Sequence, residues 1–96
     1  MDLLITYDVA TDTSAGRRRL RRVAKLCQAY GQRVQLSVFE CQLNDTQIET
    51  FEARLIEEID PAEDSLRIYL LPPDRAKRVR SHGKPLDFDL HDTLIL

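Results

Sequence analysis

The chain has 96 residues, 43% of them hydrophobic and 31% charged, which is the balance of one small globular domain with a single core. No apolar run reaches the roughly 18 to 20 residues of a bilayer-spanning helix, and no basic residue precedes the short apolar stretch at the N-terminus, so a signal peptide and a membrane partner are not expected. The net charge is only −2. We therefore expect a cytoplasmic protein, and a core this thin favours a homodimer.

The first two predicted elements are a strand and an amphipathic helix. Residues 3–9 are mostly apolar and partly β-branched, which predicts a strand buried on both faces, with Asp8 near its end. Thr13 and Ser14 are candidate caps for the helix that follows. Gly31 is expected to end this helix in a left-handed conformation. Apolar residues recur at helical spacing between these points, at Leu20, Val23, Ala24, Cys27 and Tyr30.

An extended segment and a second helix follow. Residues 33–43 alternate, but the apolar parity changes, which predicts a bulge or break near Ser37 and Val38. Asn44 and Gln47 stand at the spacing of a capping box, and the helix that they begin ends before a proline at position 61.

The C-terminal third contains a strand, a loop and a tail. In residues 64–71 apolar and polar side chains alternate, which predicts a strand with one solvent-exposed face. Residues 74–84 are basic and have no apolar periodicity, which favours a mobile loop. The alternating tail predicts one more strand. Together the elements indicate an α+β, ferredoxin-like βαββαβ sandwich over residues 1–73, with residues 74–96 as a basic loop and an additional C-terminal strand.

Positive charge is concentrated in two clusters. Residues 1–43 carry a net charge of +3 and residues 44–96 one of −5. A basic run on a helix is often only a solvated face, but crowded like charges destabilise a helix, so a polyanionic partner is the better hypothesis. The first cluster is Arg17, Arg18, Arg19, Arg21, Arg22 and Lys25. The second is Arg75, Lys77, Arg78, Arg80 and Lys84.

Cysteine and histidine offer no metal site. Cys27 and Cys41 stand far apart without a CxxC pair, so both are expected to be buried thiols rather than zinc ligands or disulfide partners. His82 and His91 have no neighbours that suggest ligation or acid-base chemistry, and we expect both to be exposed.

Three segments together resemble a known family. They are TYDVA at the end of the first strand, YGQRVQLSVFECQL before the second helix, and DSLRIYLLP, with the arginine-rich helix between the first two. This combination resembles the small CRISPR-associated adaptation proteins of the Cas-two family, from residue 1 to about residue 72.

The resemblance implies a ferredoxin-like homodimer in which the C-terminal strand pairs with the partner's sheet. It also implies that Asp8 from two chains holds Mg²⁺, or another bivalent cation such as Mn²⁺, for phosphodiester hydrolysis. One carboxylate per chain is a poor magnesium site, whereas two across a two-fold axis are adequate. The alternative is that Asp8 only begins a turn or caps the helix.

The resemblance further assigns binding residues. Basic residues of the first helix, with Arg18 and Arg19 as candidates, and Arg33 would contact nucleic acid. Tyr7, Ser37 and Phe39 would lie beside the metal, where a hydroxyl and an aromatic ring could orient a nucleotide. Phe39 has the alternative of being a core residue. Together with Arg17, Arg21, Arg22 and Lys25, these residues form the candidate site.

Two functions from different classes remain open. The first is a metal-dependent endonuclease acting on RNA or double-stranded DNA during spacer acquisition. The second is a non-catalytic dimeric adaptor that binds DNA and bridges copies of the CRISPR adaptation integrase. An unrelated ferredoxin-like binding module is a third alternative.

Overall fold

The structure is a computed structural model that describes residues 1–84, without the side chains of residues 75 and 76. Within these residues an antiparallel sheet has the strand order β2-β3-β1-β4. Its strands are β1 (Asp2–Asp8), β2 (Gly31–Gln35), β3 (Val38–Gln42) and β4 (Ser65–Leu71). This is the strand order of a ferredoxin-like sandwich, and the predicted fold class is confirmed.

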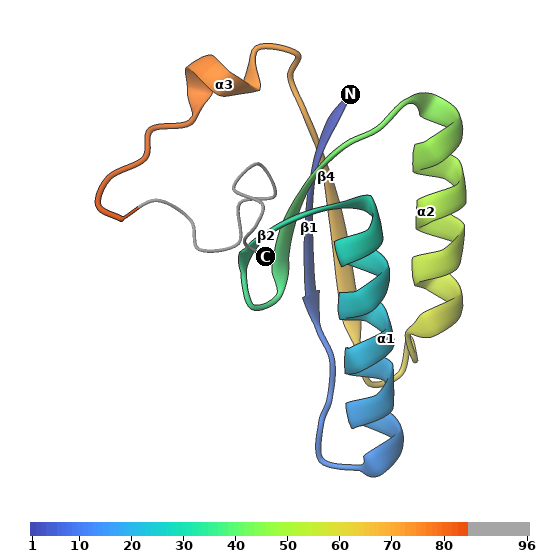
Figure 1. Ribbon diagram of the computed structural model, residues 1–96. Helices are drawn as coiled ribbons and strands as arrows, with labels where there is room; N and C mark the ends of the chain where they lie inside the picture. The colour runs from blue at the N-terminus through green and yellow to red at the C-terminus, as the bar shows by residue number, and fades with distance from the viewer. Residues whose placement is uncertain (85–96) are drawn as a thin grey trace.

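Two helices lie side by side on one face of the sheet (Figure 1). They are α1 (Ser14–Tyr30) and α2 (Asp45–Glu58). The Thr13 hydroxyl accepts a hydrogen bond from the Gly16 amide at 3.0 Å, which caps α1. At the start of α2 the side chains of Asn44 and Gln47 each accept from the other's backbone amide, at 2.8 and 2.9 Å. These bonds satisfy amides that have no partner within the helix, so the predicted starts of both helices are confirmed.

A hairpin turn explains the change of parity between residues 33 and 43. β2 and β3 are joined by a two-residue turn at Leu36 and Ser37, which reverses the chain. The predicted break near Ser37 is therefore this turn. A separate register shift lies earlier, between Arg33 and Gln35 on β2. The turn pairs β2 with β3, and β1 lies between β3 and β4, so β3 and β1 are the two inner strands.

The core lies between the sheet and the two helices. Leu3, Ile5 and Tyr7 of β1 are buried against the helices, whereas the intervening residues of the strand are only half-buried. The prediction that β1 is buried on both faces is therefore wrong. An antiparallel sheet that carries helices on one face alternates buried and accessible positions. The remaining core residues come from the other elements, namely Val9, Val23, Cys27, Phe39, Cys41, Leu43, Phe51 and Leu55.

Gly31 ends α1 for a different reason from the one predicted. Its φ of −162° is extended rather than left-handed, so the predicted conformation is wrong. A Cβ at this position would collide with the carbonyl oxygen of Glu40 and the sulfur of Cys41. Gly31 is required because the neighbouring strand β3 approaches its backbone closely.

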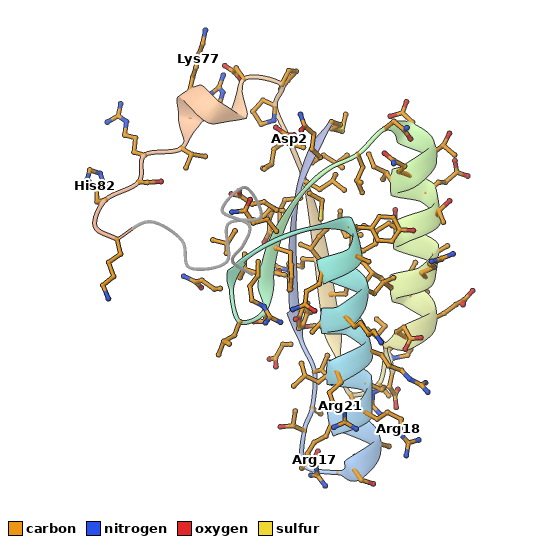
Figure 2. The ribbon with its side chains drawn as sticks, in the orientation of Figure 1. Asp2, Arg17, Arg18, Arg21, Lys77 and His82 are labelled. Carbon is orange, nitrogen blue, oxygen red and sulfur yellow. The ribbon has the colours of Figure 1, made fainter. Side chains whose placement is uncertain are left out.

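The basic segment after β4 is partly ordered. The predicted loop contains a one-turn helix, α3 (Arg75–Arg78), and the Arg78 Nε lies 2.8 Å from the Asp74 carboxylate. Figure 2 shows Lys77 and His82 at the opposite end of the molecule from the basic start of α1, so the two clusters do not form one surface. The predicted C-terminal strand lies outside the described residues. None of the helices among residues 1–84 is long and apolar enough to cross a membrane.

Candidate metal and nucleic-acid site

Asp8 stands at the end of β1, where the chain leaves the sheet. It is the last residue of the strand, it pairs in register with Ser65 of β4, and it is exposed. The strand thus gives Asp8 a fixed backbone and leaves its carboxylate accessible to a ligand.

A pocket of about 390 Å³ lies beside Asp8, between β1, α1 and the β2–β3 turn. Its polar lining consists of Asp8, Arg21, Arg33 and Ser37. These are four of the residues predicted from the sequence, and they come from four separate elements of the chain. The rest of the lining is mainly apolar and consists of Tyr7, Val9, Leu20, Ala24 and Leu36. A concave site with an apolar wall and a few convergent polar groups is the usual form of a small-ligand site.

Tyr7 holds the β2–β3 turn beside Asp8. Its hydroxyl donates to the Leu36 carbonyl oxygen at 3.2 Å, and its backbone amide donates to the Ser37 carbonyl oxygen at 3.2 Å. Burial raises the pKa of the Tyr7 phenol, partly opposed by a hydrogen bond from Arg33. Tyr7 is almost fully buried, and its two hydrogen bonds to the β2–β3 turn keep Ser37 close to the strand that carries Asp8.

Phe39 does not present its ring to a ligand. Its exposed fraction is 0%, so the prediction that it orients a nucleotide directly is wrong, and the alternative core placement is correct. The position follows from its alternation with Val38 on β3, which turns Phe39 toward the helices. Phe39 contacts the pocket only through Arg33, a lining residue whose guanidinium carbon lies 5.0 Å from the centroid of the Phe39 ring.

The cations of α1 point in different directions. Arg21 lines the Asp8 pocket, whereas Arg22 and Lys25 line a second groove, between α1 and α2. Arg17 donates to the Thr11 carbonyl oxygen at 3.1 Å. Figure 2 shows Arg17, Arg18 and Arg21 gathered at the end of α1 that extends past the sheet. The basic residues of α1 therefore surround the start of the helix and do not form a single stripe along one face.

Arg19 differs from the other cations of the cluster. Its Nε lies 2.8 Å from Oδ2 of Asp64, and its side chain is only 20% exposed. Arg19 is turned toward the α2–β4 connection, because it lies near the core side of α1. The prediction that Arg19 contacts nucleic acid conflicts with this ion pair, in which the guanidinium is already bound by a carboxylate.

Two residues of the site region were missed from the sequence. Leu36 is 80% exposed at the tip of the turn and forms part of the pocket wall. Asp64 is buried behind the loop that follows Asp8. Neither has a distinguishing sequence signal, because Leu36 continues an apolar alternation and Asp64 stands among other acids, close to Asp60 and Glu63.

The oxygen ligands at Asp8 fit a magnesium or manganese ion that is bound mainly by water and substrate phosphate. No group of three or more His, Cys, Asp or Glu side chains within residues 1–84 could cage a metal. Mg²⁺, however, often binds through one or two carboxylates and completes its shell with water and substrate phosphates. An exposed Asp8 beside two arginines that can hold a phosphate fits such an ion.

Residues 1–79 match the profile of a family described as CRISPR associated protein Cas2. The chain belongs to this family. It is 53% identical to the CRISPR-associated endoribonuclease Cas2 of Chlorobaculum tepidum over 96 residues, 100% of each chain. It is 50% identical to the CRISPR-associated endonuclease Cas2 of Halalkalibacterium halodurans over 95 residues, 99% of each chain.

The fold agrees with a solved member of the family. The crystal structure of Streptococcus pyogenes Cas2 at pH 6.5 superimposes with a TM-score of 0.77 at 52% identity, covering 86% of this chain and 100% of that chain. The family predicted from the three sequence segments is confirmed. The alternative of an unrelated ferredoxin-like binding module is excluded.

Proposed function

We propose that this chain is a metal-dependent endonuclease of CRISPR adaptation that cleaves RNA or double-stranded DNA, with Asp8 as its metal ligand. The observation that carries the proposal is the pocket in which Asp8, Arg21, Arg33 and Ser37 meet. The two buried free thiols, Cys27 and Cys41, suit a reducing compartment, so we place the activity in the cytoplasm.

The side chains of the pocket supply distinct functions in phosphodiester hydrolysis. Bound at Asp8, Mg²⁺ or Mn²⁺ would supply an activated water and neutralise charge that develops on the phosphate. Arg21 and Arg33 bind phosphate oxygens, and the Ser37 hydroxyl donates a hydrogen bond to the same nucleotide. Arg33 is preorganised for this contact by the Phe39 ring beneath it. Preorganised donors need no rearrangement as charge develops, which is the source of their effect.

We further propose that the site is completed by a second copy of the chain. One Asp8 per chain gives half of a two-carboxylate site, and a homodimer axis close to Asp8 would supply the other half. The exposure of Asp8 supports this arrangement, because the carboxylate is open to a neighbouring molecule. Residues 85–96 are the proposed strand that packs on the partner's sheet.

A second function is favoured by the spread of the cations on α1. Arg22 and Lys25 lie in a groove that the Asp8 pocket does not include. Two acids, Glu57 and Glu58, line the same groove, but Arg17 and Arg18 add positive charge at the helix end (Figure 2) beyond what one scissile phosphate requires. This surplus supports a dimeric adaptor that binds duplex DNA along α1 and bridges copies of the CRISPR adaptation integrase.

Cleavage of labelled RNA and labelled duplex DNA tests the first function. Wild type and Asp8→Asn are compared with Mg²⁺, with Mn²⁺ and with chelator. Asp12→Asn is the matched control, because Asp12 is an exposed acid four residues farther along the chain that does not line the pocket. We expect metal-dependent cleavage by wild type and Asp12→Asn, and none by Asp8→Asn.

Undiminished cleavage by Asp8→Asn would contradict the metal-site proposal. Absence of cleavage from all three proteins, together with salt-sensitive duplex binding, would leave the adaptor as the function. Sedimentation of the same proteins over a range of concentrations tests the homodimer, and a monomer at every concentration would contradict the shared site.

A further inference from the structure

Asp64 is the one buried charged residue among the side chains that the structure describes. It lies in the connection between α2 and β4, one residue before β4 begins, and its side chain has an exposed fraction of 0% in the ion pair with Arg19. A buried carboxylate is costly unless it is fully hydrogen-bonded, so its partners show what it holds in place.

Each oxygen of Asp64 accepts two hydrogen bonds. Oδ2 accepts from Arg19 Nε and from the Asp60 amide, both at 2.8 Å. Oδ1 accepts from the Ala10 amide at 3.0 Å and from the second Arg19 nitrogen at 3.3 Å. An ionised carboxylate offers about four acceptor sites, and all four are used here. Asp64 thereby ties together the start of α1, the loop before β4 and the loop after β1.

The loop after β1 is the part of this arrangement that concerns Asp8. Ala10 stands two residues beyond Asp8, where the ladder of the sheet has ended. The first turn of α1 closes on the same loop from another side, because a Cβ at Gly16 would collide with the Ala10 carbonyl oxygen. The Ala10 amide is therefore hydrogen-bonded to Asp64, and the Ala10 carbonyl packs closely against the first turn of α1.

We propose that Asp64 is a positioning residue for Asp8, and that Arg19 serves this clamp instead of binding nucleic acid. The clamp consists of Asp64, Arg19, Ala10 and Gly16. This inference rests on the proposed function of Asp8 as a metal ligand. Groups that are hydrogen-bonded to the ligands of a metal site fix the orientation of those ligands, and their loss typically lowers metal affinity by about 10- to 100-fold. Asp64 acts in the same way but through the backbone, at the amide two residues beyond Asp8.

Asp8 belongs to a strand on one side and to a short loop on the other, so the direction of its side chain depends on where the loop leaves the sheet. A reacting group displaced by about 1 Å can lose on the order of 100-fold in rate. Replacing Asp64 would free the Ala10 amide and allow this displacement without unfolding the sheet.

The test uses Asp64→Asn, with Glu63→Gln as its matched control. Glu63 is the preceding residue, is exposed, and loses the same charge on substitution. Amide hydrogen exchange at Ala10 is the first readout. We expect it to become about 10- to 100-fold faster in Asp64→Asn, because an amide side chain is uncharged and keeps one acceptor oxygen where the donors now use two, and to stay unchanged in Glu63→Gln. Exchange at Ile5, in the middle of β1, reports global unfolding and should become faster in Asp64→Asn only as far as the loss of overall stability requires, so the ratio of the Ala10 and Ile5 rates isolates the local effect.

The second readout is metal binding at Asp8, followed by Mn²⁺-induced broadening of the backbone signals of residues 8–10. This measurement requires no activity. In Asp64→Asn the Mn²⁺ concentration for half-broadening should rise by about 10- to 100-fold at a temperature where the protein is fully folded, and the concentration for half-maximal cleavage should rise in parallel. A merely structural role would lower thermal stability and leave both concentrations unchanged.

A pair of arginine variants tests the assignment of Arg19 and covers an Asp64 variant that does not fold. Arg19→Ala should raise the Mn²⁺ requirement and leave the salt dependence of nucleic-acid binding unchanged. Arg18→Ala should do the reverse, reducing the salt slope by about 1. Arg19→Lys, which keeps a donor facing Asp64, should restore part of the Mn²⁺ affinity.

The outcomes separate this inference from the proposed function. If Mn²⁺ does not broaden residues 8–10 in wild type, the metal function of Asp8 fails and the positioning inference falls with it, whatever Ala10 exchange shows. If wild type binds Mn²⁺ but Asp64→Asn and Arg19→Ala bind it equally well, only the positioning inference is overturned. A reduced salt slope in Arg19→Ala would likewise overturn the assignment of Arg19.

Discussion

The guanidinium of Arg33 lies over the ring of Phe39, with its central carbon 5.0 Å from the ring centroid. Phe39 is completely buried and Arg33 lines the pocket beside Asp8, so this contact joins the core to the candidate site. A cation on an aromatic face is restrained by the ring. The core therefore helps to set the position of Arg33 in the pocket.

Phe39→Leu tests this relationship. Loss of the ring should destabilise the fold by about 1.5 kcal/mol, measured by urea denaturation. It should also weaken nucleic-acid binding about threefold, because the contact that restrains Arg33 is worth about 0.5 to 1 kcal/mol. Phe51→Leu is the matched control, since Phe51 is equally buried but stacks on Tyr30. Equal affinities of the two variants would contradict the role given to Phe39.

The pocket cations can be distinguished from other surface charge by salt dependence. Arg21→Ala and Arg33→Ala should each reduce the slope of log affinity against log salt by about 1, because each removes one phosphate contact. Both should also lower the rate of cleavage. Lys77→Ala removes the same charge at the opposite end of the molecule from the basic start of α1 (Figure 2) and is the control. A slope that falls equally in all three would indicate a general electrostatic effect.

Acid titration should reveal the charge on Asp64. Its pKa is held below the usual range, first by the hydrogen bond from Arg19 and further by the backbone amides of Asp60 and Ala10. Since the folded pKa lies below the unfolded one, this carboxylate stabilises the fold above about pH 4 and loses the effect as the pH falls through the folded pKa. Asp64→Asn should therefore cost about 2 kcal/mol at neutral pH.

The difference between wild type and Asp64→Asn should shrink progressively in acid. Urea denaturation of both proteins from neutral pH downward measures it, with Glu63→Gln as the control. A difference that stays constant across the range would show that the ionised form of Asp64 contributes nothing.

The two thiols should be inert in the folded protein. Cys27 and Cys41 are buried and unpaired, as predicted. Burial raises the pKa of Cys27 to about 12 and that of Cys41 to about 11. Because the thiolate is the reactive species, a thiol reagent should modify neither at mildly alkaline pH, and both in denaturant. Fast modification without denaturant would contradict their burial.

Gly31→Ala should destabilise the protein by steric overlap. The added methyl group would meet the backbone of Glu40 and the sulfur of Cys41, and such overpacking costs about 1 to 3 kcal/mol. Gly83→Ala is the comparison, because Gly83 has a φ of 87° but open space around it. Its cost should be about 1 kcal/mol or less, and a larger loss for Gly83→Ala than for Gly31→Ala would contradict this explanation.

Features that depend on neighbours in sequence were predictable. The caps at Thr13 and Asn44 were identified because a capping side chain bonds amides two or three residues ahead. The break at Ser37 was visible because alternation has a period of two residues, so a change of parity marks a turn or bulge. Asp8 was identified through the family resemblance of the surrounding segment, and its position at the end of β1 agrees with that prediction.

Features that depend on distant segments were not predictable. The interpretation of Gly31 was wrong because its requirement arises from β3, which crosses close to its backbone. Arg19 could not be separated from Arg18 by type or spacing, since its distinguishing partner, Asp64, lies 45 residues away. The burial of Phe39 required the register of β3 against β1.

The sequence by itself determined the elements, their order, the family and the supply of charge, because helix and strand periodicity and capping are local properties of the chain. The tertiary structure alone decided which charges remain available. Six cations in one helix cluster are equivalent in sequence, but packing turns Arg21 toward Asp8, Arg22 toward α2 and Arg19 toward a buried carboxylate. The direction of a side chain on a helix is set by its angle to the core, and the identity of what it meets there is set by the fold.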